Sequence, residues 1–128
     1  MRNHMRTVNS GSMFEREFGY SRAVRLGPLV CVSGCTAGGL IGADTQDMGV
    51  QAAEAMRRAG EAMEQLGATW ADVVRTRFFV TDIEAWQAVG AVHKKFLGDA
   101  RPATSIVEVR KLVLPELLIE IEVDAYLP

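Results

Sequence analysis

Short apolar segments in the first third of the chain predict a β-hairpin. Residues 21–27 (SRAVRLG) and 28–34 (PLVCVSG) are rich in β-branched residues and are joined at a Gly-Pro dipeptide, which is typical of a turn. Residues 73–82 (VVRTRFFVTD) are β-branched and aromatic, and predict a third strand. After the hairpin, residues 36–46 are rich in glycine and predict a loop.

Apolar residues at spacings of three and four predict two helices. The first spans about residues 45–66 and stops at Gly67, and the second follows a capping box formed by Thr81 and Glu84 and stops at Gly98. The apolar stripes are Met48, Ala52, Met56, Ala59, Met63 and Leu66 in the first helix, and Ile83, Trp86, Val89, Val92 and Phe96 in the second.

Two further strands are predicted at the end of the chain, around a turn at Pro115. They cover residues 103–109 (ATSIVEV) and 117–126 (LLIEIEVDAY). In the last strand acidic and apolar residues alternate, so that three carboxylates share one face. These acids are Glu120, Glu122 and Asp124.

The order of the elements predicts an α+β fold, in which two helices cover one face of a mixed sheet. The strands at 28–34 and 73–82 are apolar at successive positions, as strands buried on both faces are. We therefore expect a second subunit over the other face. The first twenty residues are polar, and we expect an irregular segment over 1–18 followed by a single domain over 19–128.

Composition and charge narrow the partners of this domain. The 128 residues carry a net charge of −2, and their 14 Lys and Arg residues are scattered, which argues against a nucleic-acid partner. The sequence shows neither an apolar run long enough to span a bilayer nor a secretory signal, so we expect a cytoplasmic protein without a membrane partner. With only two cysteines, Cys31 and Cys35, we expect reduced thiols, no metal and no cofactor.

Four motifs in this order resemble the RidA/YjgF family, also labelled endoribonuclease L-PSP or translation initiation inhibitor. They are GYSRAV, VCVSG, VVRTRFFVTD and the ending RPATSIVEV with LLIEIEVDA, and they span roughly residues 19–126. The resemblance implies a chorismate-mutase-like fold assembled as a homotrimer with ligand clefts between subunits. It also implies hydrolysis of reactive imines and enamines, such as 2-aminoacrylate, to a keto acid and ammonia.

One family feature is missing from this sequence. The deaminase branch holds the substrate carboxylate with the arginine of a Pro-Ala-Arg-Ser stretch, where this chain has Thr104. A threonine offers one donor and no charge in place of a bidentate guanidinium. Ile106 likewise stands where that branch often has cysteine, and Gly90 and His93 replace a typical asparagine and tyrosine. The resemblance places Tyr20, Gly34 and Glu120 at positions that border the cleft.

Each candidate site residue has a structural interpretation as well as a functional one. Glu120 is a candidate for proton transfer in the cleft, but Arg75 and Arg77 alternate on another strand and would pair with the acids. Thr104 is a candidate ligand donor or a β-favoured edge residue. Arg101 is a candidate replacement for the missing arginine or a solvated surface residue. Arg22 is a second candidate partner for an anion, or an exposed charge beside the first strand.

Two further side chains have mixed interpretations. Cys35 is a candidate thiol at the mouth of the cleft, whereas Cys31 fits a buried apolar position. His93 is a candidate proton donor, or only borders the apolar stripe of its helix.

Two functions from different classes fit these features. One is a trimeric enzyme that deaminates a small imine, enamine or carbonyl compound. The alternative is a non-catalytic trimer that binds a small metabolite. RNA cleavage, suggested by one family label, is disfavoured by the slightly acidic charge.

Overall fold

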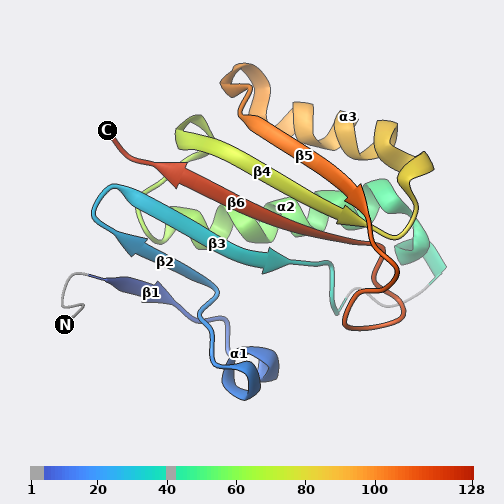
Figure 1. Ribbon diagram of the computed structural model, residues 1–128, viewed down its shortest axis with the longest axis horizontal. Coiled ribbons are helices and arrows are strands. Elements are labelled where there is room, and N and C mark those ends of the chain that lie inside the picture. Colours follow the sequence, from blue (N-terminus) through green and yellow to red (C-terminus); the bar gives the residue numbers. More distant parts are fainter. Residues whose placement is uncertain (1–4, 40–42) are drawn as a thin grey trace.

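The computed structural model describes residues 5–39 and 43–128 (Figure 1). The predicted loop at 36–46 therefore lies partly outside the described residues. The strands are β1 (Arg6–Val8), β2 (Ala23–Leu26), β3 (Leu29–Cys35), β4 (Val73–Val80), β5 (Ala103–Glu108) and β6 (Ile119–Tyr126). The helices are α1 (Met13–Phe18), α2 (Met48–Glu64) and α3 (Trp86–Leu97), with short 3-10 turns η1 (Ala43–Gln46), η2 (Trp70–Asp72), η3 (Ile83–Ala85) and η4 (Gly98–Ala100).

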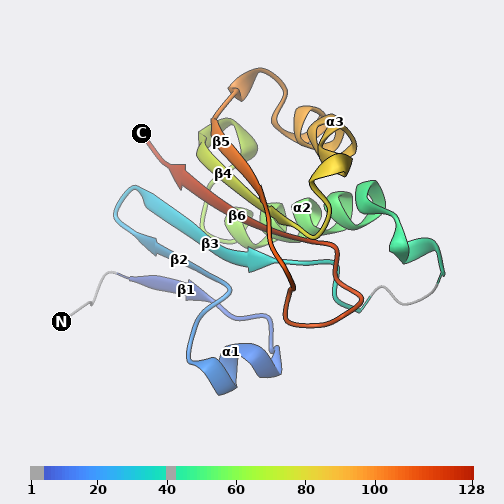
Figure 2. The same cartoon turned by 45° about the vertical axis from the view of Figure 1, so that its right-hand side comes forward.

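The strands form one six-stranded mixed sheet in the order β1-β2-β3-β6-β4-β5. Only β4 and β5 are parallel, and the remaining neighbours are antiparallel. Both ribbon views show α2 and α3 on the same face of this sheet (Figures 1 and 2). The predicted α+β fold with a mixed sheet and two covering helices is confirmed.

The core lies between α2 and the central strand β6. Alternate residues of β6 are fully buried against the helices, and so is the predicted stripe of α2. Alanines in that stripe bring the helix close to the sheet, while Met56 and Met63 fill the remaining space. Each large side chain buried in this way contributes about 1.5–3 kcal/mol. The buried residues of β6 are Ile119, Ile121, Val123 and Ala125.

Turn residues act largely as the sequence predicts. The Gly27-Pro28 dipeptide joins β2 to β3, and Gly67 adopts the left-handed conformation that terminates α2 (φ 91°). The cap before α3 differs, because Asp82 rather than Thr81 accepts the backbone N–H of Glu84.

Trp86 also differs from its predicted place in the apolar stripe of α3. Its side chain is 54% exposed, and the helix is instead anchored by the buried Val89 and Leu97. The other residues of the predicted stripe pack against the core, with Val89 buried and Ile83, Val92 and Phe96 partly buried. Trp86 therefore lies outside the core.

Residues 6–18 contain a strand and a helix, where the sequence predicted an irregular segment. β1 pairs with β2 through Val8, which faces the core, and α1 begins at the N-cap Ser12 and ends at the left-handed Gly19. The sequence did not predict these elements, because this segment is polar and α1 buries only one residue, Glu15. They form one wall of the site described below.

Within the described parts of the chain, no helix is both long and apolar enough to cross a membrane.

Candidate functional site

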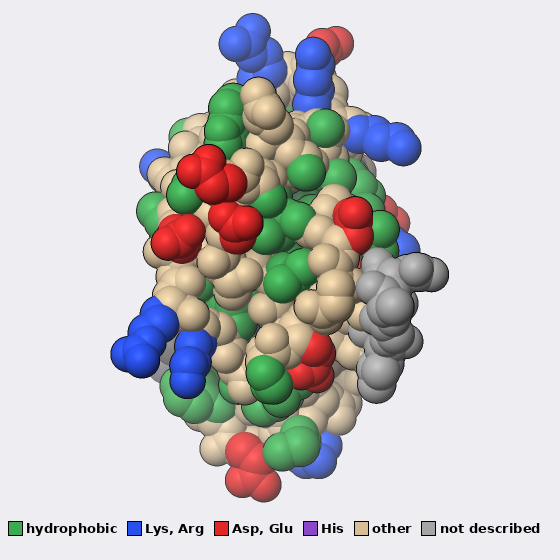
Figure 3. All heavy atoms as spheres, turned by 90° about the vertical axis from the view of Figure 1, so that its right-hand side faces the viewer, with side chains coloured by type: hydrophobic (Ala, Val, Ile, Leu, Met, Phe, Trp, Pro, Cys, Tyr) green, Lys and Arg blue, Asp and Glu red, His purple; other side chains and the backbone are tan. Residues whose placement is uncertain are grey.

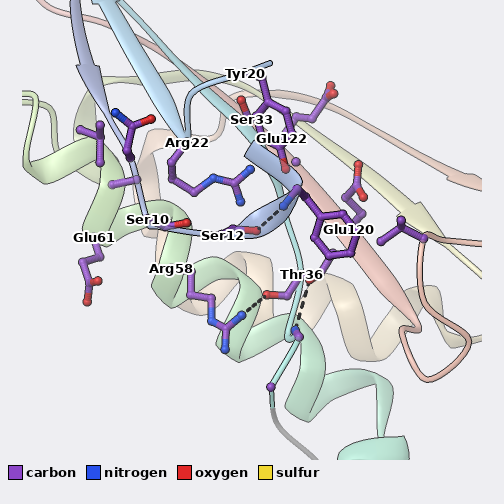
Figure 4. Close-up of a pocket in the computed structure, with 18 of the residues that line it drawn as sticks. Ser10, Ser12, Tyr20, Arg22, Ser33, Thr36, Arg58, Glu61, Glu120 and Glu122 are labelled. Carbon is purple, nitrogen blue, oxygen red and sulfur yellow. Dashed lines mark hydrogen bonds between the residues drawn. The ribbon is translucent and has the colours of Figure 1, made fainter. Parts of the chain in front are cut away.

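A cavity of about 1050 Å³ lies where α1, the end of β3, α2 and the loop before β6 meet (Figure 4). Its walls carry side chains that are far apart in the sequence, among them Tyr20, Arg22, Ser33, Arg58 and Glu120. The loop wall at residues 109–118 is held by the buried amide of Gln51, whose Nε2 donates to the carbonyl of Glu116 (3.0 Å). The amide N–H of Leu118 donates to Oε1 of the same side chain (2.8 Å).

Arg22 is the main cation of this cavity. Its side chain is 17% exposed, and its Nε and Nη2 atoms are buried without a hydrogen-bond partner among the described residues. Nη1 makes one weak contact, with the sulfur of Cys35 (3.7 Å). A guanidinium carries five N–H donors, so most of this group's donors are unused. Because an unpaired buried donor costs free energy, Arg22 is suited to bind an anionic ligand.

Glu15 approaches Arg22 without satisfying it. Its Oε2 lies 3.9 Å from Nε of Arg22, beyond hydrogen-bonding distance. The buried carboxylate is instead bound by Ser10, whose backbone N–H and hydroxyl both donate to it. Glu15 therefore fixes the β1–α1 connection and lowers the cost of burying the Arg22 charge nearby.

Aromatic side chains border the cavity next to Arg22. The Tyr20 ring lies 5.6 Å from Cζ of Arg22, in the range of a cation–π contact. Phe18 meets Tyr20 edge to face at 6.1 Å and is 85% exposed. The rim is thus apolar outside and cationic inside.

Glu120 lies on β6 and faces this cavity, as its predicted cleft position requires (Figure 4). Its carboxylate packs directly on Gly34, where any side chain would collide with it. Burial raises the pKa of Glu120, the neighbouring Glu122 raises it further, and Arg22 opposes the shift. No hydrogen bond from a described residue reaches the carboxylate. A half-buried acid with an elevated pKa is a suitable proton donor and acceptor.

The other two acids of the row face a different partner. Nη1 of Arg77 on β4 lies 3.1 Å from Oδ2 of Asp124 and 3.6 Å from Oε1 of Glu122. The predicted cross-strand pairing is therefore correct for these two acids and for Arg77. No described side chain pairs with Arg75. Of the three carboxylates, Glu120 is the one left available to a ligand.

Arg58 of α2 forms the opposite wall and is held in place on two sides. Its Nη1 donates to the carbonyl of Thr36 (3.1 Å), and its Nε donates to Glu54 (2.7 Å). Glu54 also accepts from Arg57, and these hydrogen bonds lower its pKa to about 2. Arg58 therefore connects the helix to the end of β3.

Three of the predicted site residues lie elsewhere. Thr104 and Arg101 are exposed, Ile106 packs against the core, and none of them lines the cavity. Arg101 ends η4 with a left-handed backbone (φ 45°). Within one chain the cavity unites Tyr20, Gly34 and Glu120, but not the residues at the start of β5.

The two cysteines exchange their predicted environments. Both are free thiols, but Cys35 is fully buried beneath the cavity and Cys31 is half-buried on the open face of the sheet. A β-bulge between Val32 and Cys35 turns the Cys35 side chain toward the core, and burial raises its pKa. Cys35 is therefore a neighbour of Arg22 rather than a thiol at the mouth of a cleft.

Sequence reasoning did not find Ser33, Thr36 or Arg58 as cavity residues. Ser33 lies beside the bulge in β3, and a bulge leaves no reliable sequence signal beyond the adjacent Gly34. Arg58 has the signature of an i,i+4 pair with Glu54, which suggests a solvated helix face.

Metal binding finds no support in the part of the chain that the structure describes, since no three His, Cys, Asp or Glu side chains there gather in a way that could hold an ion.

On the face shown in Figure 3, Asp and Glu side chains cluster beside a mostly apolar and neutral centre, and Lys and Arg lie toward its margins.

Fold and site together define a small α+β domain with a candidate ligand cavity at one end of its sheet. The family model of endoribonuclease L-PSP matches residues 12–127. The chain therefore belongs to this family, which is the RidA/YjgF family.

Individual relatives agree with this assignment. A member of the YjgF/YER057c/UK114 family from Mycobacterium tuberculosis is 53% identical, with a TM-score of 0.89 over 96% of this chain and 99% of that chain. The YjgF gene product of Escherichia coli is 30% identical, with a TM-score of 0.74 over 84% and 87% of the two chains. A 2-iminobutanoate/2-iminopropanoate deaminase from Salmonella typhimurium is 32% identical over 83% of this chain and 85% of its own length.

Proposed function

We propose that the chain hydrolyses small imines that carry a carboxylate, releasing ammonia and a keto acid, with Arg22 as the carboxylate anchor and Glu120 as the acid and base. The observation that carries this proposal is the pairing, in one cavity, of an unsatisfied guanidinium with a carboxyl group of raised pKa. The activity named for the Salmonella relative supports the same reaction class.

The reaction balances with water as the only co-substrate. The Glu120 carboxylate accepts a proton from water as the water oxygen bonds to the imine carbon and the C=N π electrons pass to nitrogen. The nitrogen takes up a proton, giving a carbinolamine. A second proton transfer to nitrogen, with loss of the hydroxyl proton, breaks the C–N bond, so that ammonia leaves and the carbonyl forms. An enamine such as 2-aminoacrylate enters after protonation of its β-carbon by the acid form of Glu120.

Arg22 would provide the charge that Thr104 lacks. A carboxylate bound to its free N–H groups supplies the missing acceptors and fixes the imine carbon near Glu120. Arg101, the other candidate, is exposed and does not line the cavity.

We also propose that the chain assembles as a homotrimer. The sheet face opposite the helices exposes large apolar side chains, three of them adjacent in register across β2, β3 and β6 and one on β5. Exposed apolar side chains of this kind mark an interface. They are Leu26, Leu29, Val107 and Tyr126.

Ammonia release from imines freshly generated from several amino acids tests the enzymatic function. We expect turnover by the wild type, and at least a hundredfold lower kcat/KM for Glu120→Gln, since removal of a general acid–base group costs about 10²–10⁴. Asp124→Asn is the matched control, because this acid of the same row pairs with Arg77 (3.1 Å) and does not line the cavity. Wild-type turnover that survives Glu120→Gln would refute the assigned role, and the absence of turnover on every imine would favour the non-catalytic metabolite-binding alternative.

A further inference from the structure

The buried amide of Gln51 connects three segments of the chain. Its side chain is 2% exposed and lies in the first turn of α2. Nε2 donates to the carbonyl of Thr45 before the helix and to that of Glu116 (3.0 Å), and Oε1 accepts the backbone N–H of Leu118 (2.8 Å). A side-chain amide has two N–H donors, so both are used. One side chain thus ties η1, α2 and the loop before β6 together.

The backbone of Leu118 is fixed from two directions. Its N–H donates to Gln51, and its carbonyl accepts the backbone N–H of Thr81, just after β4 (3.0 Å). Leu118 directly precedes β6 and stands two residues before Glu120. The hydrogen bonds of Leu118 therefore determine where the start of β6 lies.

Glu120 depends on this attachment more than the later residues of β6 do. In the described part of the chain the β3–β6 ladder ends at the pair of Cys35 with Ile121, so Glu120 is paired only on its other side, with Phe79 of β4. The raised pKa of Glu120 comes from burial and from nearby charges, and no described side chain lowers it by donating a hydrogen bond. The position of the carboxylate therefore follows the backbone at the start of β6.

The same amide holds a wall of the cavity that contains Glu120. Leu117 lies between the two loop residues that Gln51 binds, is 3% exposed and lines the cavity. The N–H of Leu117 donates to the carbonyl of Leu114 (3.2 Å), which closes the turn before it. Release of this loop from α2 would admit water to the cavity and reduce the burial of the Glu120 carboxylate.

We propose that Gln51 is a positioning residue, which fixes the loop at 109–118 and the start of β6 so that the Glu120 carboxylate stays in place against Gly34. Gln51 does not itself line the cavity, so it acts through the backbone of Leu118. The expected effect on turnover rests on the proposed imine hydrolysis, whereas the expected effect on the surroundings of Glu120 does not.

The pKa of Glu120, measured by NMR titration of its carboxyl carbon, tests this role without a substrate. Gln51→Met keeps the length of the side chain and removes all three hydrogen bonds. We expect the pKa of Glu120 to fall toward its ordinary value of 4.5, by about half a unit or more, because burial is the main cause of its elevation. Gln46→Met is the matched control, since this exposed amide contacts the same Glu116 carbonyl at 3.4 Å, and it should leave the pKa unchanged.

The ammonia assay provides a second measurement on the same variants. Gln51→Met should lower kcat about ten- to a hundredfold, the effect of a displaced catalytic group, and leave KM within about twofold. KM is spared because the proposed carboxylate anchor, Arg22, contacts Glu15 and Cys35 rather than the loop. Asp72→Asn, which breaks the capping box of η2 beyond the other end of α2, should lower the melting temperature without changing kcat or KM.

An unchanged pKa of Glu120 in folded Gln51→Met would overturn the positioning role, as would a raised KM with an unchanged kcat. If the wild type hydrolyses no imine, the proposed function fails, and the pKa comparison still decides the role of Gln51. If Gln51→Met does not fold, Gln51→Asn replaces it, because it withdraws the amide from the loop by about 1.5 Å, the length of one C–C bond. The pKa of Glu120 should fall in that variant too, and an unchanged value would equally refute the role.

Discussion

Gly34 lies directly beneath the carboxylate of Glu120, with no space for a side chain between them. The contact joins β3 to β6 at the bulge and explains why a glycine stands at this position in a strand. The carboxylate is the flexible end of its side chain, so an added methyl group would displace it rather than the backbone.

Gly34→Ala should therefore reduce imine hydrolysis about ten- to hundredfold while leaving the fold intact, since a catalytic group displaced by about 1 Å can lose that much rate. Ammonia release and the melting temperature should be measured together. Gly90→Ala is a suitable control, because nothing lies within contact distance of an added Cβ there. Unimpaired activity in Gly34→Ala would show that the position of the Glu120 carboxylate is not critical.

Arg22→Ala should lower kcat/KM toward 2-aminoacrylate by about 10²–10⁴, because two hydrogen bonds to a charged group contribute roughly 1.5–3 kcal/mol each. Arg101→Ala should have little effect, since its side chain is exposed and outside the cavity. The comparison of both variants in the same ammonia assay decides between the two cations. The reverse result would place the anchor at the start of β5.

Glu120→Gln should stabilise the protein at neutral pH. The folded-state pKa of Glu120 is raised above its ordinary value of 4.5, so the folded state holds the proton more tightly than the unfolded state. The stabilising contribution of this proton is fully present below about pH 4.5 and is lost as the pH rises through the folded-state pKa.

The melting temperature of Glu120→Gln should accordingly exceed that of the wild type at pH 7.5, and the difference should shrink toward pH 4. Asp124→Asn, which removes an acid paired with Arg77, should show no such gain. A lower melting temperature for Glu120→Gln at pH 7.5 would contradict the assigned cost of burying this carboxylate.

Light scattering should give the mass of a trimer at micromolar concentration. Leu29→Lys should weaken this assembly, because it places a charge in the exposed apolar group of the open sheet face. Val50→Lys on α2 is a control of similar exposure on the other side of the sheet. A wild-type monomer would refute the trimer and any cleft between subunits.

Regular periodicity made most of the fold predictable. Met56 belongs to a row of apolar residues spaced three and four apart, and Ile121 to a row spaced two apart. Their burial follows from these helix and strand periods. The cavity was only partly predictable, because its geometry depends on structural features that leave no periodic pattern in the sequence. A bulge turns Cys35 inward, and a six-residue helix places Glu15 next to Arg22. Such features arise from tertiary contacts that no local pattern encodes.

The short ladder between β1 and β2 favours local opening at this edge of the sheet. Three residue pairs hold β1, and α1 buries only Glu15, so this part of the cavity wall is the least stable unit of the sheet edge. Amide hydrogens of residues 6–18 should exchange with solvent through local opening, long before those of β6. A ligand that reaches Arg22 would slow that exchange, which makes hydrogen–deuterium exchange a direct reporter of occupancy even for compounds that undergo no reaction.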